Sequence, residues 1–162
     1  MSEDRLSAYR EKRDREHTPE PVPEQGPLPQ GHDDTFVIQE HHARRLHWDF
    51  RLERDGVLVS WALPKGLPQD PKTNRLAIRT EDHPLEYASF EYEIPPGQYG
   101  AGTVKIWDRG TYETEEWTDE KIKVVLHGSR ASGRYVLIHT GDNQWLMHRM
   151  DPPDPAPDHP AP

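Results

Sequence analysis

The chain has 162 residues, of which 32% are hydrophobic, and a formal net charge of −9. This length accommodates one domain of about 110 to 130 residues, and the absence of cysteine excludes disulfides and thiolate metal sites. No apolar run approaches the ~18 residues of a membrane span and the N-terminus lacks a signal-peptide core, so we expect a cytoplasmic protein with no membrane partner.

Residues 1–34 are predicted to be a polar leader followed by a connector. Residues 3–17 are polar and partly helical in pattern, with Leu6 and Tyr9 as their few apolar anchors. Prolines and glycines then recur from Thr18 to Gly31, which excludes regular structure there.

Residues 35–150 are predicted to form one mainly β domain. Short apolar runs alternate with turn signals, and Asp55-Gly56 is typical of the tip of a tight hairpin. The expected strands cover residues 35–40, 46–53, 56–63, 75–79, 102–107, 121–127, 135–139 and 145–150. About eight strands at this spacing indicate a small antiparallel β-barrel or a sandwich. Residues 151–162 have the composition of a disordered, proline-rich tail.

The run from residue 45 to residue 52, RLHWDFRL, places three polar groups at alternate positions. In a strand, His47, Asp49 and Arg51 would project from one face, and large apolar groups from the other. Imidazole and carboxylate together suit a divalent transition metal, and the arginine fork suits phosphate. The competing interpretation is an ordinary solvated face with cross-strand ion pairs.

Two further histidines, His41 and His42, precede this run. If the strand continues through them they face opposite sides, so only one of the pair can join the metal site. The pattern therefore predicts a metal-dependent site for a phosphorylated substrate, built from two imidazoles and one carboxylate.

The distribution of charge limits the kind of nucleic-acid contact. Residues 36–80 carry eight Lys and Arg against five Asp and Glu, whereas residues 81–120 carry two against eleven. A protein that coats a long duplex needs a broad cationic surface. This chain is better suited to holding a few phosphates at the end of a strand.

Four segments, taken in order, resemble one known family. They are FVIQEHHARRLHWDFRL at 36–52, SWALPKG at 60–66, EDHPLEY at 81–87, and GAGTV with WDRG at 100–110. Together they look like the 3′-phosphoesterase module of bacterial DNA ligase D. In that ligase the module is joined to polymerase and ligase domains, which nothing in this chain resembles, so a free-standing version is expected.

The resemblance implies a small β-barrel enzyme that heals DNA 3′ ends during repair by end joining. Such an enzyme removes a terminal ribonucleoside from a primer strand, leaving a 3′-phosphate, and then removes that phosphate to leave a 3′-hydroxyl. The implied cofactor is Mn²⁺, with Zn²⁺ or Co²⁺ as alternatives. The implied partners are primer-template 3′ ends and separate ligase, polymerase and end-binding proteins.

By the same resemblance, individual residues acquire expected roles. The metal ligands would be His41, His47 and Asp49. The catalytic residues would be Arg51, His83 and Tyr87, of which Arg51 and His83 would hold the scissile phosphate. Lys65 and Arg75, with Tyr87, would complete the phosphate and active-site contacts. The leader would enter the site, and Arg13, Asp14, Glu20 and Glu81 would serve the ribonuclease step.

Two other functions remain open. A mononuclear iron oxygenase also uses two histidines and one carboxylate on a small barrel, and would give Arg51 a substrate carboxylate to bind. A non-catalytic module that binds DNA ends would keep the barrel and the basic strand without turnover.

Overall fold

The computed structural model describes residues 4–13, 17–24, 28 and 31–150. The elements in chain order are α1 (Ser7–Glu11), β1 (Thr35–His42), β2 (Leu46–Arg54), β3 (Val57–Leu63), β4 (Asn74–Arg79), β5 (His83–Pro84), the 3₁₀ helix η1 (Leu85–Ser89), β6 (Tyr92–Ile94), β7 (Gly102–Trp117), β8 (Lys121–His127), β9 (Ser132–Gly141) and β10 (Gln144–Arg149). No helix among the described residues is long and apolar enough to cross a membrane.

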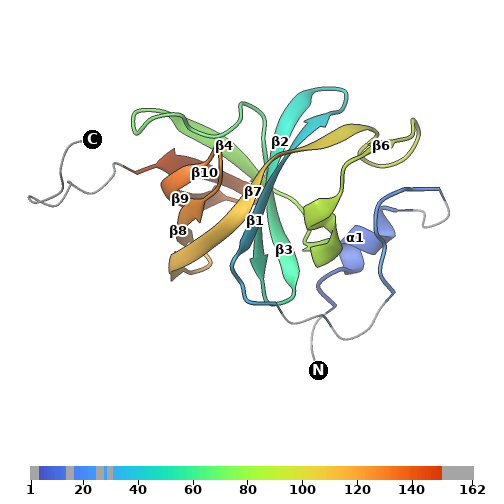
Figure 1. Ribbon diagram of the computed structural model, residues 1–162, viewed down its shortest axis with the longest axis horizontal. Helices are drawn as coiled ribbons and strands as arrows, with labels where there is room; N and C mark the ends of the chain where they lie inside the picture. Colours follow the sequence, from blue (N-terminus) through green and yellow to red (C-terminus); the bar gives the residue numbers. More distant parts are fainter. Residues whose placement is uncertain (1–3, 14–16, 25–27, 29–30, 151–162) are drawn as a thin grey trace, which may run out of the picture.

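Eight of the strands form a closed antiparallel barrel (Figure 1). The order β1-β2-β3-β4-β10-β9-β8-β7 is closed by pairing of β7 with β1, while β5 and β6 are short additions beside β3 and β7. The β2–β3 connection is tight because Asp55 and Gly56 both have positive φ, at 52° and 85°. Two such residues give the turn a twist that matches the flanking strands.

The barrel interior is filled by large side chains. Phe36, Phe50, Trp61 and Trp145 are among the buried residues of this main core. Trp61 packs edge-on against Trp145, with ring centroids 5.7 Å apart. An eight-stranded barrel has an interior just wide enough for side chains to fill, and here Phe36, Phe50, Trp61 and Trp145 fill it, so a site for a ligand must lie elsewhere.

A second buried cluster lies on the outer face of the barrel and includes residues of β1, β3, β6 and β7. Val37 and Leu58 alternate with core residues along their strands and meet Tyr9 of α1, Tyr87 of η1 and Phe90. Figure 1 shows α1 and η1 side by side against this face, at the opposite end of the molecule from β8 and β9. The leader is therefore packed onto the barrel.

The expected β-barrel of about eight strands is confirmed, and every expected strand has a counterpart. The main difference is β7, which runs over 16 residues rather than ending at residue 107. Its first residues pair with β6 on one edge and β1 on the other, and its residues from Thr111 onward pair with β8. Register shifts near Ile38 of β1 and near Thr114 mark irregularities along this strand. The helix in the leader is short, covering only Ser7–Glu11.

Tyr9 is expected to hold the leader to the barrel. It is fully buried, its ring lies 5.0 Å from that of His83, and its hydroxyl donates to the Pro21 carbonyl at 2.5 Å. Tyr9→Ala should release the described part of the leader while leaving the barrel folded, because the barrel core does not contain Tyr9. Hydrogen exchange should show loss of protection confined to the leader and η1.

Trp61→Ala is the matched control. Removing this fully buried ring from the barrel core should lower the free energy of unfolding of the whole domain by about 3 to 5 kcal/mol. Global unfolding of Tyr9→Ala would contradict the separation of leader and barrel.

Candidate metal centre and anion site

Three side chains on the outer barrel face form a group able to hold a metal ion. Antiparallel register places His41 of β1 directly opposite His47 of β2, and Asp49 follows two residues along β2. One ligand atom of each lies within 4.8 Å of the others. Asp49 Oδ2 is 3.6 Å from His41 Nδ1 and 3.4 Å from His47 Nε2, a spacing suited to atoms that share a cation at about 2.1 Å.

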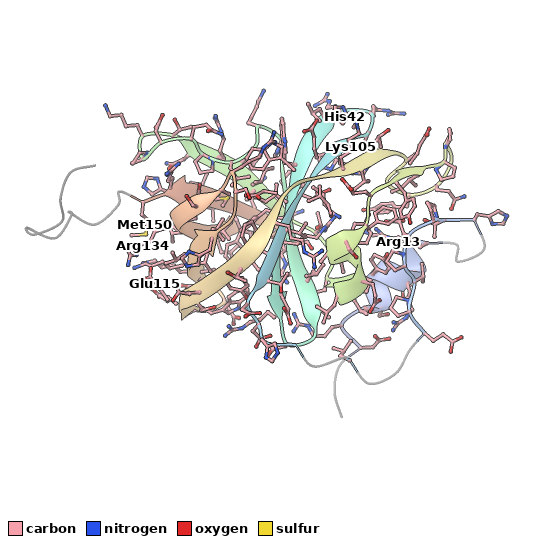
Figure 2. The ribbon with its side chains drawn as sticks, viewed as in Figure 1. Arg13, His42, Lys105, Glu115, Arg134 and Met150 are labelled. Carbon is pink, nitrogen blue, oxygen red and sulfur yellow. The ribbon has the colours of Figure 1, made fainter. Side chains whose placement is uncertain are left out.

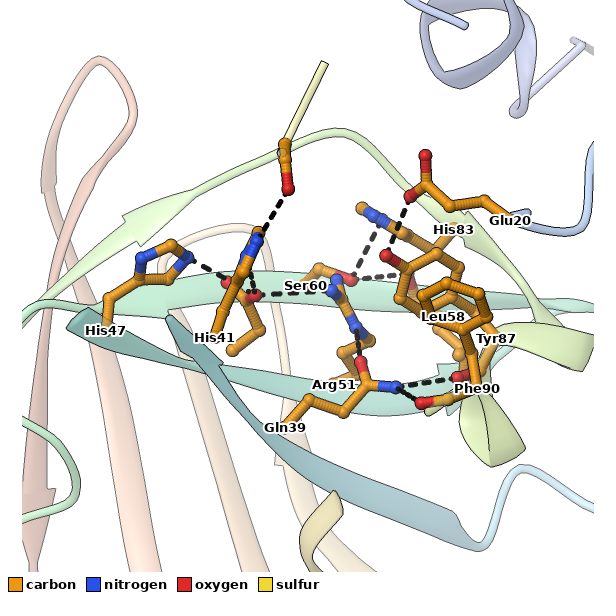
Figure 3. A network of polar contacts seen from close by, with 12 residues as sticks. Glu20, Gln39, His41, His47, Arg51, Leu58, Ser60, His83, Tyr87 and Phe90 are labelled. Carbon is orange, nitrogen blue, oxygen red and sulfur yellow. Dashed lines mark hydrogen bonds and ion pairs between the residues drawn. The ribbon is translucent and has the colours of Figure 1, made fainter. Parts of the chain in front are cut away.

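The second nitrogen of each imidazole is held by a backbone carbonyl. His41 Nε2 lies 2.6 Å from the Gly100 oxygen (Figure 3), and His47 Nδ1 lies 3.2 Å from the Arg45 oxygen. A carbonyl only accepts, so each of these nitrogens carries the proton. The lone pairs of His41 Nδ1 and His47 Nε2 are then available toward Asp49, the arrangement typical of metal-binding histidines. The residues present therefore fit a divalent cation.

His42 takes no part in this group. Its side chain is exposed and its Nε2 pairs with Glu40 at 2.5 Å. Strand alternation therefore places His41, not His42, in the group, as the resemblance implied.

The charge of Asp49 is maintained in spite of its burial. Desolvation opposes ionisation, but the Arg51 charge and the contacts of His41 and His47 with the carboxylate outweigh it and hold the pKa of Asp49 far below its ordinary value. The carboxylate of Asp49 stabilises the protonated form of His47 and so raises the pKa of that imidazole. An ionised carboxylate between two imidazoles is the form a cation requires.

Arg51 is a buried guanidinium with one unused donor. Only 3% of its surface is exposed. Its Nε donates to Gln39 Oε1 at 2.8 Å, its Nη2 lies 3.5 Å from Asp49 Oδ2, and its guanidinium lies 4.7 Å from the centre of the Tyr87 ring. Its buried Nη1 has no hydrogen-bond partner among the described residues. A buried arginine donor without an acceptor beside a metal-ligand group is suited to an anion.

His83 faces Arg51 as a neutral imidazole (Figure 3). Burial lowers its pKa well below the ordinary value, and the charges of Arg51 and Arg13 lower it further. Its Nδ1 lies 2.8 Å from the Glu81 carbonyl oxygen and therefore carries the proton. The unprotonated nitrogen of neutral His83 is consequently Nε2.

The leader brings a buried carboxylate, Glu20, to the same site. Arg13 donates to both of its oxygens, at 3.1 and 3.3 Å, and the Tyr87 hydroxyl donates at 2.7 Å. Thr18 adds a fourth hydrogen bond at 3.0 Å. Burial raises the pKa of Tyr87 well above its usual range, so its hydroxyl stays protonated and donates.

Glu81 joins the leader to the loop after β4. It accepts from Arg13 Nη1 and from Lys12 Nζ, each at 3.1 Å. Burial opposes its ionisation, yet its own backbone N–H and the two cations lower its pKa overall. Lys12 also lies 4.9 Å above the Tyr99 ring, which closes this side of the site.

One cavity of about 260 Å³ collects most of the predicted site residues. Its walls include Arg13, Glu20, His41, His47, Asp49, Arg51, Glu81, His83 and Tyr87. Lys65 is exposed and lines a neighbouring hollow that shares His47 with the cavity. Arg75 lies on the same face of β4 as the core residue Ala77 and does not line the cavity. Asp14 lies outside the described residues.

Several residues with a part in this arrangement were not singled out from the sequence. Gln39 fastens η1 by donating to the carbonyls of Tyr87 and Phe90, at 2.9 and 3.0 Å, while it positions Arg51. Gly100 supplies the carbonyl that orients His41. Gln39 was detectable as a polar residue on the same strand face as His41, whereas the Gly100 contact depends on how the loop at 95–101 folds.

This fold and site define a small β-barrel protein with a metal-ligand group next to an anion-binding arginine. Residues 39–139 match the family described as the DNA ligase D 3′-phosphoesterase domain. The chain belongs to this family. A 3′-phosphoesterase domain is a hydrolase of phosphoesters at DNA 3′ ends, so the resemblance drawn from the four motifs is confirmed and an iron oxygenase is set aside.

Similar proteins are multifunctional non-homologous end joining proteins LigD. The chain is 61% identical over 151 residues to that of Mycobacterium bovis, covering 91% of this chain and 20% of the relative. It is 54% identical over 158 residues to the Mycolicibacterium smegmatis protein, covering 91% and 21%, and 45% identical over 155 residues to the Pseudomonas aeruginosa protein, covering 88% and 18%. The chain thus spans about a fifth of the length of these curated relatives.

The lowered pKa of His83 predicts a specific loss of stability in mild acid. Below about pH 6.5 the imidazole of His83 is protonated in the unfolded chain but stays neutral in the folded protein. The free energy of unfolding therefore falls as the pH falls toward the folded-state pKa of His83. Between pH 7.5 and 5.5, wild type should lose about 1 kcal/mol more than His83→Gln, which has no imidazole to protonate. Urea unfolding at the two pH values measures this difference, and equal losses would contradict a neutral buried His83.

Proposed function

We propose that this chain hydrolyses phosphoesters at DNA 3′ ends, as a 3′-phosphatase and a 3′-ribonuclease acting in end-joining repair. The observation that carries the proposal is the buried Nη1 of Arg51, unpartnered among the described residues, next to the group of His41, His47 and Asp49. A phosphate monoester is the ligand whose oxygens satisfy both features at once.

Arg51 is preorganised for a phosphate before the substrate arrives. Gln39 and Asp49 fix two of its nitrogens, so the third donates to a nonbridging oxygen without rotation of the side chain. A fixed donor in a water-poor site stabilises the charge that builds on the equatorial oxygens during attack. Water forms the new bond to phosphorus while the bond to the 3′ oxygen breaks, which leaves a 3′-hydroxyl and inorganic phosphate.

His83 acts as the proton donor in this step. It is neutral in the free protein because burial and the cations Arg51 and Arg13 lower the pKa of its imidazole. A phosphate dianion beside Arg51 offsets these charges, so His83 takes up a proton with the substrate and gives it to the departing 3′ oxygen.

The metal ligands in this proposal are His41, His47 and Asp49, and the ion is manganese. Two imidazoles and a carboxylate also accept zinc or cobalt, and manganese is favoured because the family resemblance implies it. Bound there, a divalent cation supplies Lewis-acid polarisation of a nonbridging phosphate oxygen. Asp49 provides the anionic ligand and orients His47 for the same task.

The leader serves the ribonuclease step in this proposal. Arg13, Glu20 and Glu81 form a polar wall on the Tyr87 side of the cavity, where a terminal ribonucleoside can meet both cationic and carboxylate groups. Water forms the new bond to phosphorus while the bond from phosphorus to the 5′ oxygen of the terminal ribonucleoside breaks. The nucleoside departs with a proton on its 5′ oxygen, and a 3′-phosphate remains for the second reaction. Asp14, outside the described residues, is assigned to this wall by resemblance alone.

The remaining assignments concern partners and organisation. The substrates are primer-template 3′ ends with a terminal ribonucleotide or phosphate, and the reaction product suits a separate ligase or polymerase. Residues 1–34 serve as a site-forming leader and residues 35–150 as the phosphoesterase domain, with residues 151–162 as a tail. Tyr87 contacts the substrate phosphate through the face of the site it shares with Arg51, and Lys65 adds positive charge at the neighbouring hollow. Arg75 is assigned to the phosphate by resemblance alone, because it does not line the cavity.

A labelled primer-template with a single 3′-ribonucleotide tests the function directly. Incubation with manganese should convert it through a 3′-phosphate into a shortened 3′-hydroxyl strand, and chelator should stop both steps. A parallel 3′-phosphate primer isolates the second reaction. Binding of both substrates without any metal-dependent conversion would replace this proposal with a non-catalytic end-binding module.

Asp49→Asn should abolish both reactions and weaken manganese binding by at least about tenfold. The amide keeps the shape of the side chain but removes the anionic ligand that the cation requires. Calorimetric titration with manganese and the gel assay measure the two effects. Asp55→Asn, at the exposed hairpin tip where asparagine also tolerates positive φ, is the control and should change neither. Full activity of Asp49→Asn would show that Asp49 is not a metal ligand.

Glu20→Gln should separate the two reactions. Glu20 contacts the leader and Tyr87 but none of the three metal ligands, so we expect the ribonuclease rate to fall by about 10²-fold or more and the phosphatase rate by less than about threefold. Glu11→Gln on the exposed side of α1 is the control. Equal loss of both rates in Glu20→Gln would show that the leader has no separate role.

A further inference from the structure

A second hollow adjoins the catalytic cavity at His47 and Ala62, which line both. Its other walls are Arg45, Leu46, Pro64 and Lys65, from the β1–β2 turn and the segment after β3. No carboxylate lines it among the described residues. The two hollows therefore lie in a row and meet at His47, one of the three metal-ligand residues.

The two ends of this row differ in charge. On the leader side, Arg13 and Lys12 are already paired with Glu20 and Glu81. At the end next to the β1–β2 turn, neither Arg45 nor Lys65 pairs with a carboxylate in the part of the chain that the structure describes. Figure 2 shows Arg13 within the leader and His42 at the edge that carries the β1–β2 turn.

We propose that the hollow next to His47 binds the upstream phosphodiester of the DNA strand, with Arg45 as its main specificity contact. This inference rests on the proposed function. The departing ribonucleoside occupies the leader side, so the rest of the strand must leave the scissile phosphate in the other direction. Among the described residues, the cations at the end next to the β1–β2 turn are the ones without a carboxylate partner, so they are free to contact a backbone phosphate.

The apolar part of the hollow suits the sugar and base of the penultimate nucleotide. Leu46 is 42% exposed, although it belongs to a strand, and Pro64 is also exposed beside it. Such residues pack against a deoxyribose or a base without selecting a sequence. The hollow therefore recognises a strand rather than a particular base, as a repair enzyme for varied ends requires.

Arg45 has two separable parts, which makes it testable. Its backbone carbonyl holds His47 Nδ1 at 3.2 Å, whereas its side chain is free to contact DNA at the hollow. Arg45→Ala keeps the carbonyl, so manganese affinity should stay within about twofold of wild type. Arg44→Ala is the matched control because Arg44 is exposed in the same turn but does not line the hollow.

The experiment compares three 3′-phosphorylated compounds. A deoxynucleoside 3′-phosphate has no upstream phosphate, a deoxydinucleotide ending in a 3′-phosphate has one, and a primer has many. For wild type, kcat/KM should rise from the first to the second compound. Arg45→Ala should lower kcat/KM for the dinucleotide and the primer by at least about tenfold, through KM, and leave the mononucleotide unchanged. Where turnover is too slow, inhibition constants against the primer replace kcat/KM.

Further measurements make the outcome decisive. Arg45→Lys should recover part of the loss, and the slope of log KM against log salt for the primer should fall by ~0.7 in Arg45→Ala. An equal effect of Arg45→Ala on all three compounds, or no effect on any, would overturn the hollow as a phosphate site. Failure of wild type to release phosphate from any compound would instead refute the proposed function.

Discussion

The buried ion pair between Arg51 and Asp49 is the constraint around which the site is built. Burying a guanidinium and a carboxylate costs several kcal/mol per ion unless each is paired and hydrogen-bonded. Here the two groups offset each other at 3.5 Å, Gln39 holds the arginine, and the imidazoles hold the carboxylate. Removing either charge would leave its partner buried and uncompensated.

The same pair connects the barrel to its covering. Gln39 accepts from Arg51 and donates to the carbonyls of Tyr87 and Phe90, so the position of Arg51 and the position of η1 are linked. Tyr87 then reaches Glu20 of the leader through its hydroxyl. A displacement of the leader would thus change the position of Arg51 through the side chains of Tyr87 and Gln39. This explains how a short, mostly irregular segment takes part in a site whose other groups come from strands.

The location of the site follows from the size of the barrel. Eight strands enclose a volume that Phe50, Trp61 and Trp145 already fill, so no substrate can enter the interior. The polar alternation of β2 must therefore face outward, where water would surround it. The leader and η1 cover that face and give buried surroundings to groups that strand alternation alone would leave solvated. Burial is what lowers the pKa of His83 and, among the described residues, leaves Arg51 Nη1 without a partner.

Much of this arrangement was predictable from local sequence pattern. Alternation along β2 placed His47, Asp49 and Arg51 on one face and the aromatic residues on the other, and the structure agrees. The opposite orientations of His41 and His42 followed from the same period. These predictions succeed because a strand imposes its geometry on each residue independently of the rest of the chain.

Contacts between distant segments were not predictable in this way. The pairing of Arg13 with Glu81, 68 positions away, depends on how the leader folds back over β1 to β3, and periodicity carries no information about such docking. Likewise, the position of Arg75 on the core side of β4 reflects a register that the short apolar run did not fix.

The net charge of the chain does not show how the fold distributes the charged side chains in space. A chain of net charge −9 should repel a polyanion, yet many of its carboxylates are concentrated away from the mouth of the site. The strand β7 and the β7–β8 turn hold exposed Glu113, Glu115 and Glu120, at the end of the barrel far from the leader. At the site, the leader carboxylates are neutralised by Lys12 and Arg13. Under the proposed function, a DNA end therefore meets two separate cationic contacts among the described residues, the unpartnered Nη1 of Arg51 and the side chain of Arg45. Two such contacts suit a strand terminus better than the length of a duplex.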